Sequence, residues 1–105
     1  MRMDAVLHAI AEPHRRRILE LVGARELSAG EIATSFDVTR PAISQHLTVL
    51  TKAGLVSMRR EGTRRIYSAR PEGLQELREY LDGFWSVRLD RLKAAAERAE
   101  RGRAR

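Results

Sequence analysis

The stretch that decides the fold is TRPAISQHLTVLTKAG, residues 39–54. Thr39 suits a helix N-cap, and the first turn of a helix tolerates a proline such as Pro41. The apolar residues fall on one stripe at helical spacing: Ile43, Leu47 and Leu50. Gly54 can end the helix, because glycine readily adopts the left-handed conformation that follows a C-terminus. The stretch therefore predicts a helix from Thr39 to about Ala53.

A second, shorter helix is predicted just before it. Ser28 and Glu31 have the spacing of a capping box, in which each side chain bonds the backbone of the other residue. The short helix would carry Ile32 and Phe36, and Asp37 would lie in a tight link. Two short helices joined by about three or four residues form the outline of a helix-turn-helix.

Two more helices are predicted upstream. The first runs from about Asp4 to Ala11, and its apolar residues have helical spacing: Met3, Val6, Leu7 and Ile10. Pro13 can open the second, which runs to about Val22, with Gly23 as its stop.

Downstream, a β-hairpin is predicted. Two extended runs, Leu55–Arg60 and Thr63–Ser68, flank the pair Glu61-Gly62, and such a pair is typical of a hairpin turn. A lone hairpin is unstable, so this one must pack against the helices. The residues expected to make that contact are Val56, Met58, Ile66 and Tyr67.

The last segment predicts one long helix from about Pro71 to Arg101. Its apolar residues recur at steps of mostly three and four, and 30 residues of helix span roughly 45 Å. This stripe is longer than the core of so small a domain, so we expect it to pack against a second chain. The expected dimer interface comprises Val6, Leu7, Ile10, Phe84, Trp85, Leu89 and Leu92. An alternative for the aromatic residues is a small-molecule pocket between subunits.

Composition excludes several classes of protein. The chain has 105 residues, which suits one domain over residues 1–101 with a frayed basic tail at 102–105. It has no cysteine, which excludes a disulfide scaffold and a thiolate metal site. No apolar run approaches the roughly 18 residues of a membrane span, and the start does not resemble a signal peptide. The expected location is the cytoplasm, at the nucleoid.

The net charge of +6 is concentrated in one region. Residues 40–70 contain seven arginines and lysines against Glu61 alone, whereas the segments on either side are almost neutral. A localised basic face favours a polyanionic partner, most often nucleic acid.

The outer face of the Thr39–Ala53 helix has the composition that a DNA groove requires. It carries hydrogen-bonding and basic side chains and no carboxylate, and glutamine and arginine are residues that read bases. The arginines of the hairpin can contact phosphates beside the groove. An ordinary solvated face is the alternative. The predicted DNA-binding residues are Thr39, Arg40, Ser44, Gln45, Thr48, Lys52, Arg59, Arg60, Arg64 and Arg65.

Several segments together resemble the ArsR-type (ArsR/SmtB) winged-helix repressors over about residues 4–92. They are Ala11–Leu19, Arg40–Leu47, Ala53–Val56 and the arginine-rich hairpin. The resemblance implies a mainly α winged helix-turn-helix, in the order of four helices, a two-stranded wing and a long C-terminal dimerisation helix. It also implies a homodimer built from the first and last helices, which a signal releases from operator DNA.

The sequence departs from the metal-sensing members of this family. Ser28 and Gly30 stand where their short helix carries a thiolate pair, and the last helix has no histidine. His8, His14 and His46 share no metal-binding spacing, so we expect no metal site and no cofactor. Zinc, cadmium and arsenite are therefore not expected to change DNA affinity.

The sequence predicts a homodimeric repressor of transcription that binds an inverted-repeat operator in duplex DNA. No catalytic constellation or phosphate-binding loop is present, so we expect no enzyme. One alternative is a metal-responsive repressor with histidine and carboxylate ligands. Another is an interaction module whose wing binds RNA or an acidic protein.

Overall fold

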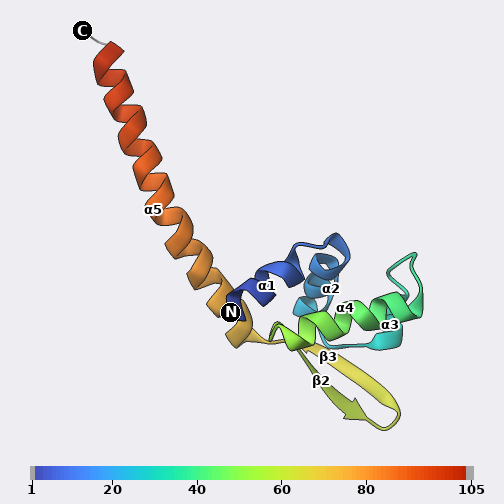
Figure 1. The fold of residues 1–105 in the computed structure, drawn as a ribbon. Helices are drawn as coiled ribbons and strands as arrows, with labels where there is room; N and C mark the ends of the chain where they lie inside the picture. Colours follow the sequence, from blue (N-terminus) through green and yellow to red (C-terminus); the bar gives the residue numbers. More distant parts are fainter. Residues whose placement is uncertain (1, 104–105) are drawn as a thin grey trace. The chain divides into compact units, whose positions relative to one another are not determined.

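The computed structural model describes residues 2–103, which form five helices and three short strands (Figure 1). The elements are α1 (Arg2–Ile10), α2 (Pro13–Ala24), β1 (Leu27–Ser28), α3 (Ala29–Ala33), α4 (Arg40–Lys52), β2 (Val56–Glu61), β3 (Arg64–Ala69) and α5 (Pro71–Arg103). The fold is therefore mainly α with a β-hairpin wing, as expected. The expected frayed tail is helical as far as Arg103, and positions 104–105 lie outside the described residues.

Short polar side chains begin the helices where the sequence indicated. Ser28 and Glu31 form the predicted capping box, and the Thr39 hydroxyl accepts a hydrogen bond from the backbone N–H of Ala42 at 3.2 Å. Gly54 ends α4 with φ of 81°, the left-handed conformation that favours glycine. Glu12 caps α2, and the sequence did not single out this residue.

The sheet has one strand more than predicted. β3 is its central strand, paired antiparallel with β2 on one side and with β1 on the other. Tyr67 of β3 lies opposite Met58 of β2 and Leu27 of β1. A strand of two residues has no periodicity to detect, which is why β1 escaped the sequence analysis. It ties the base of the wing to the start of α3.

The hydrophobic core is drawn from the four short helices, the two strands of the hairpin and β1. Its buried apolar residues are Val6, Ala9, Ile18, Val22, Leu27, Ile32, Ile43, Leu47, Leu50, Ala53, Leu55, Val56, Ile66 and Tyr67. Three of the four predicted contact residues of the hairpin lie in this set. Met58 lies on the same face as Val56 and Tyr67 but is 40% exposed, and it lines a hollow with Thr48 and Lys52 at the edge of the core.

Some predicted boundaries differ from the structure. Gly23 does not stop α2, which continues to Ala24. α3 ends at Ala33, so Phe36 follows the helix, and the link to α4 comprises residues 34–39. Val6 was expected at a dimer interface, but it is 2% exposed within its own chain and has no surface left for a partner.

The chain forms two compact units, residues 1–75 and 76–105, and α5 contributes to both. In the first unit Gly73 is buried so closely against Gly54 that an added Cβ would overlap the Gly54 carbonyl oxygen. In the second unit none of residues 76–103 is buried. No helix within residues 2–103 is both long enough and apolar enough to cross a membrane.

Candidate nucleic-acid interface

The outer face of α4 is exposed along its length. Arg40, Ser44, Gln45, Thr48 and Lys52 are all exposed, while the stripe on the other side of the helix is buried. Helical periodicity alone produces this division, because residues three and four apart share a face. The face is therefore free to enter a groove without uncovering the core.

Residues from α4 and from the wing surround one shared hollow. Arg40 and Ser44 line it from α4, Arg64 and Arg65 line it from β3, and Gly30 lines it from α3. A second hollow joins Thr48 and Lys52 of α4 to Arg65 of β3. The structure thus brings together six of the ten residues that the sequence assigned to DNA, with Arg65 at both hollows.

Carboxylates hold two of the wing arginines. Arg59 donates to Glu61 at 2.6 Å and to Glu26 at 3.1 Å, and these bonds raise the pKa of Arg59 above its usual value. Arg64 donates to Glu31 at 3.1 Å. Hydrogen bonds from Ser28, together with the charge of Arg64, lower the pKa of the Glu31 carboxyl. The pairs with Glu26 and Glu31 tie the wing to the residue before β1 and to α3, and the sequence analysis did not anticipate them.

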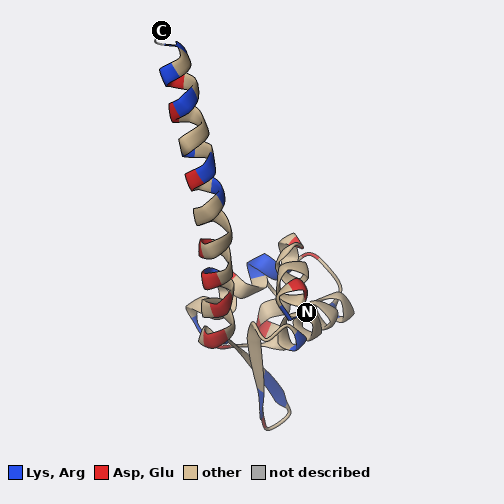
Figure 2. Ribbon diagram, turned by 60° about the vertical axis from the view of Figure 1, so that its left-hand side comes forward, with Lys and Arg blue, Asp and Glu red and all other residues tan. Residues whose placement is uncertain are grey.

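The other two wing arginines have no carboxylate partner among the described residues. Arg60 and Arg65 lie opposite one another on β2 and β3 and are both exposed. Figure 2 shows basic residues along both strands of the wing, with little acidic colour beside them. Arg60 and Arg65 are therefore the wing cations most available to an added anion.

A polar cluster lies behind the outer face of α4. His14 donates from Nδ1 to Glu12 Oε1 at 2.8 Å, and His46 Nδ1 lies 3.9 Å from Glu12 Oε2. The buried Arg15 donates to His46 Nδ1 at 3.3 Å and to the carbonyls of Ala9 and His8. Since His46 is far from the other residues in the sequence, residue spacing could not reveal this cluster.

The electrostatics of the cluster favour a neutral His46. Burial lowers the pKa of His46, as do the charges of Arg15 and His14, while Glu12 opposes the shift. Burial would raise the pKa of the Glu12 carboxyl, but hydrogen bonds from His14 and from the Arg15 backbone outweigh it and lower the pKa. Glu12 is thus held as a carboxylate beside a neutral imidazole.

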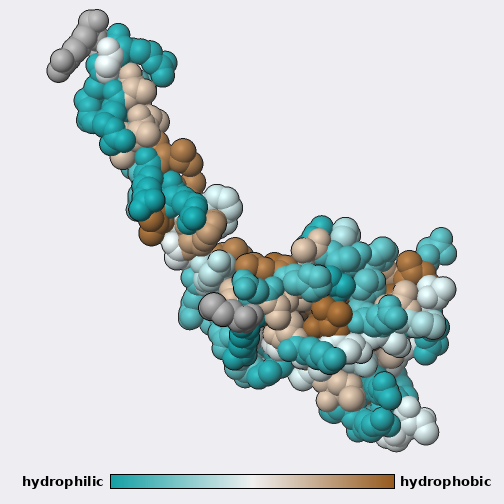
Figure 3. Space-filling model, viewed as in Figure 1, coloured by the Kyte–Doolittle hydropathy of each residue, from teal (hydrophilic) through white to brown (hydrophobic). Residues whose placement is uncertain are grey.

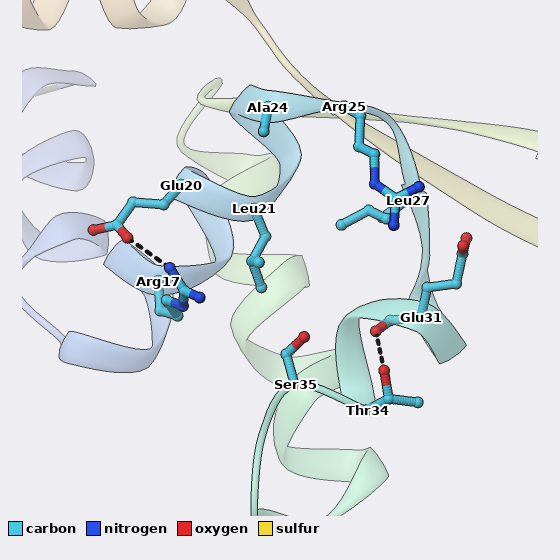
Figure 4. A pocket seen from close by; sticks show the side chains of 9 residues that line it. All are labelled: Arg17, Glu20, Leu21, Ala24, Arg25, Leu27, Glu31, Thr34 and Ser35. Carbon is cyan, nitrogen blue, oxygen red and sulfur yellow. Dashed lines mark hydrogen bonds and ion pairs between the residues drawn. The ribbon is translucent and has the colours of Figure 1, made fainter.

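An open pocket lies between α2 and α3, away from these residues (Figure 4). The ion pair of Arg17 and Glu20 lines one side of it, and Arg25 and Glu31 project from the other. With two arginines and two glutamates, the lining favours neither anions nor cations. We assign no function to this pocket.

A helix-turn-helix followed by a basic wing, with a carboxylate-free helix face beside it, defines a winged-helix nucleic-acid-binding protein. Comparison with known proteins agrees. A family described as a helix-turn-helix domain matches residues 10–59. The HTH-type transcriptional regulator Rv2034 of Mycobacterium tuberculosis is 47% identical over 83 residues, which cover 79% of this chain and 78% of that protein.

Two further relatives extend the match. The transcriptional repressor SdpR of Bacillus subtilis is 37% identical over 82 residues, which cover 78% of this chain and 91% of the repressor. The solution structure of the homodimeric winged helix-turn-helix DNA-binding domain of Mb0332 from Mycobacterium bovis, a possible ArsR-family regulator, is 30% identical. The structural match covers 86% of this chain and 83% of the Mb0332 chain, with a TM-score of 0.66.

The chain belongs to the ArsR-type family of winged helix-turn-helix transcriptional regulators. Members of this family regulate transcription and are not enzymes. The resemblance seen in the sequence and its expected fold class are thereby confirmed.

Proposed function

We propose that this regulator is a homodimeric repressor that binds an operator in duplex DNA, with α4 in the major groove and the wing on the backbone. The observation that carries the proposal is the exposed face of α4, which has no carboxylate and shares a hollow with Arg64 and Arg65. A repressor is the function named for SdpR. Since its partner would be the chromosome, the protein would work in the cytoplasm at the nucleoid.

The two basic elements would divide the work. Gln45 and Ser44 stand on the exposed face of α4 and would contact base edges, because the N-terminal part of a recognition helix lies deepest in the groove. Arg40, at the entry of the helix, is placed for either bases or backbone. Thr39, Thr48 and Lys52 would contact the flanking phosphates.

The wing arginines would differ in their contributions. Arg60 and Arg65 can bind phosphates without giving up a partner, whereas Arg59 and Arg64 would first have to leave Glu26, Glu61 or Glu31. Exchanging one anionic partner for another offsets much of the gain. We therefore expect Arg65 to contribute more to DNA affinity than Arg59.

The proposed dimer interface is the apolar stripe of α5 together with α1. Mb0332 is described as homodimeric, and here the stripe is largely exposed (Figure 3). The proposed residues are Leu7, Ile10, Phe84, Trp85, Leu89 and Leu92. Residues 1–101 would then act as one DNA-binding and dimerisation domain. Two-fold symmetry predicts an inverted-repeat operator with half-sites about one helical turn apart.

The test is to select genomic fragments with the purified protein and to measure binding of the enriched sequence by fluorescence anisotropy. We expect one inverted repeat to be enriched. A tenfold excess of random duplex, RNA or polyglutamate should fail to displace that repeat from the protein. That excess is roughly 1.4 kcal/mol of competition, below the 4–10 kcal/mol typical of sequence specificity. Equal displacement by RNA or polyglutamate would instead support an interaction module.

A further inference from the structure

We propose that Glu12, His14 and His46 form a binding site for a divalent transition-metal ion such as Zn²⁺, which would join the start of α2 to α4. The three side chains offer one carboxylate oxygen and two imidazole nitrogens within 4.8 Å of one another. Imidazole with a carboxylate is a ligand set that Zn²⁺ uses, in contrast to the all-oxygen sets of Mg²⁺.

The distances between the ligand atoms suit a single ion. Zinc binds nitrogen and oxygen at about 2.0–2.2 Å, so tetrahedral donor atoms need to be roughly 3.3 Å apart. In the structure His14 Nδ1 and Glu12 Oε1 are 2.8 Å apart, and His46 Nδ1 and Glu12 Oε2 are 3.9 Å apart. These values lie on either side of the required spacing and end on different oxygens of Glu12, so the carboxylate and at least one imidazole would have to shift to bring all three donors to one ion.

Neighbouring groups hold the cluster in place. The two imidazole rings are stacked, with centroids 5.5 Å apart and planes at 14°, so one ring would have to turn to direct its nitrogen at a shared ion. The Phe36 ring lies 5.7 Å from His14, and the backbone N–H of Arg15 donates to Glu12 at 3.0 Å. The side chains of Glu12, His14 and His46 are 28%, 42% and 19% exposed, so the site is sheltered but open to solvent. Three protein ligands leave a fourth position for water or a small anion.

Binding requires two exchanges within the cluster. The ion would take the position of the proton that His14 Nδ1 donates to Glu12, and that proton would move to Nε2, because a metal-bound imidazole keeps its N–H on the other ring nitrogen. Arg15 would give up His46 Nδ1 but would keep its bonds to the carbonyls of Ala9 and His8. The nearby charge of Arg15 opposes a cation, which makes this a site for reversible rather than permanent binding.

This site differs from the expectation that the chain holds no metal. That expectation followed from the missing thiolates and from the spacing of the histidines along the sequence. The cluster becomes visible only when α4 packs beside the start of α2. Since His46 lies on α4, occupancy would link the helix proposed to read DNA to its neighbour in the core.

The test is to titrate the tag-free, full chain with Zn²⁺ by calorimetry and with Co²⁺ by visible absorption. We expect one ion per chain and a Co²⁺ ligand-field band, both unaffected by excess Mg²⁺. His14→Gln and His46→Gln should each weaken Zn²⁺ binding roughly tenfold or more, since loss of a ligand should cost at least as much as loss of an outer-shell partner. Glu12→Gln should do the same.

The third histidine provides the matched control. His8 is exposed on α1, and its side chain is not part of the cluster, so His8→Gln should bind Zn²⁺ like the parent. Circular dichroism checks the fold of each variant, and His14 is exposed enough for its substitution to be tolerated. No Co²⁺ band in the parent, unchanged binding in His14→Gln, or an equal loss in His8→Gln would overturn the proposal.

Discussion

The winged-helix body (residues 2–75) and the distal part of α5 (residues 76–103) both carry apolar residues at helical spacing, but only the body buries them. In the body, helical stripes from α1, α2 and α4 are buried by their own chain, down to 0% exposure for Ile18 and Leu50. From Glu76 to Arg103 a comparable stripe is exposed, with Trp85 at 52% and Leu92 at 63%. The pattern that builds a core in one region finds nothing to cover it in the other.

The difference teaches that periodicity predicts a helix face but not what covers the face. Within the distal region the aromatic side chains contact each other: Tyr80 stacks on Phe84, and Phe84 meets Trp85 edge to face. Arg88 lies over the Phe84 ring at 3.6 Å. Such contacts along one helix recover only a small part of the free energy that burial would supply. A second copy of the chain is the occupant that we propose for this stripe.

Trp85→Ala tests this difference with the largest expected effect. If a partner chain buries the indole fully, the substitution should weaken the dimer by about 3–5 kcal/mol. Val87→Ala is the control, because Val87 is also 52% exposed but lies outside the proposed interface. Sedimentation equilibrium measures both. A parent that is a folded monomer at high concentration, or equal losses from the two variants, would contradict the proposed interface.

Two glycines of α5 provide the next test. A Cβ at Gly73 would overlap the Gly54 carbonyl oxygen, whereas one at Gly83 would meet nothing within 4 Å. Gly73→Ala should therefore cost about 1–3 kcal/mol of overpacking in urea denaturation. Gly83→Ala should stabilise the helix by up to about 1 kcal/mol, because alanine has the better helix propensity. Equal effects would mean that the start of α5 is not packed against the body.

The Glu31 carboxyl should make a smaller, pH-dependent contribution to the stability of the winged-helix body. Hydrogen bonds from Ser28 lower its pKa below 4.5 in the folded state, so the unfolded chain binds the proton more readily. Its contribution to stability is complete above pH 4.5 and is lost as the pH falls through the lower, folded-state pKa. Glu31→Gln keeps the capping-box geometry, so its stability should depend less on pH below 4.5 than that of the parent. Parallel profiles from chemical denaturation would refute this account.

Most of the body could be predicted from the sequence because its signals are local. The Ser28–Glu31 capping box, the Thr39 cap and the Gly54 stop each depend on residues within one turn. Other features depend on packing between elements, which local patterns do not show. They are β1, the pairs of Arg59 and Arg64 with distant glutamates, and the contact of His14 with His46. Met58 is exposed although it shares a face of β2 with the buried Val56, because alternation along a strand does not say how far along the strand the core extends.

The two halves of the DNA interface, α4 and the wing, should differ in how much they contribute to the salt dependence of DNA affinity. A phosphate contact is alike on every sequence, and each one lost should reduce the salt slope by about 0.9. Arg65→Ala should therefore weaken binding to operator and random DNA alike, with a shallower slope on both. Arg59→Ala is the matched control, and its slope should change less because carboxylates already hold Arg59.

The most direct test of the account is a salt titration of Gln45→Ala and Arg65→Ala on both DNAs by fluorescence anisotropy. Gln45→Ala should cost about 1–3 kcal/mol on the operator and little on random DNA, with an unchanged slope. Arg65→Ala should lose affinity equally on both. If Gln45→Ala weakens both DNAs equally while Arg65→Ala loses operator binding alone, then α4 is not the reading helix and the proposed assignment is reversed.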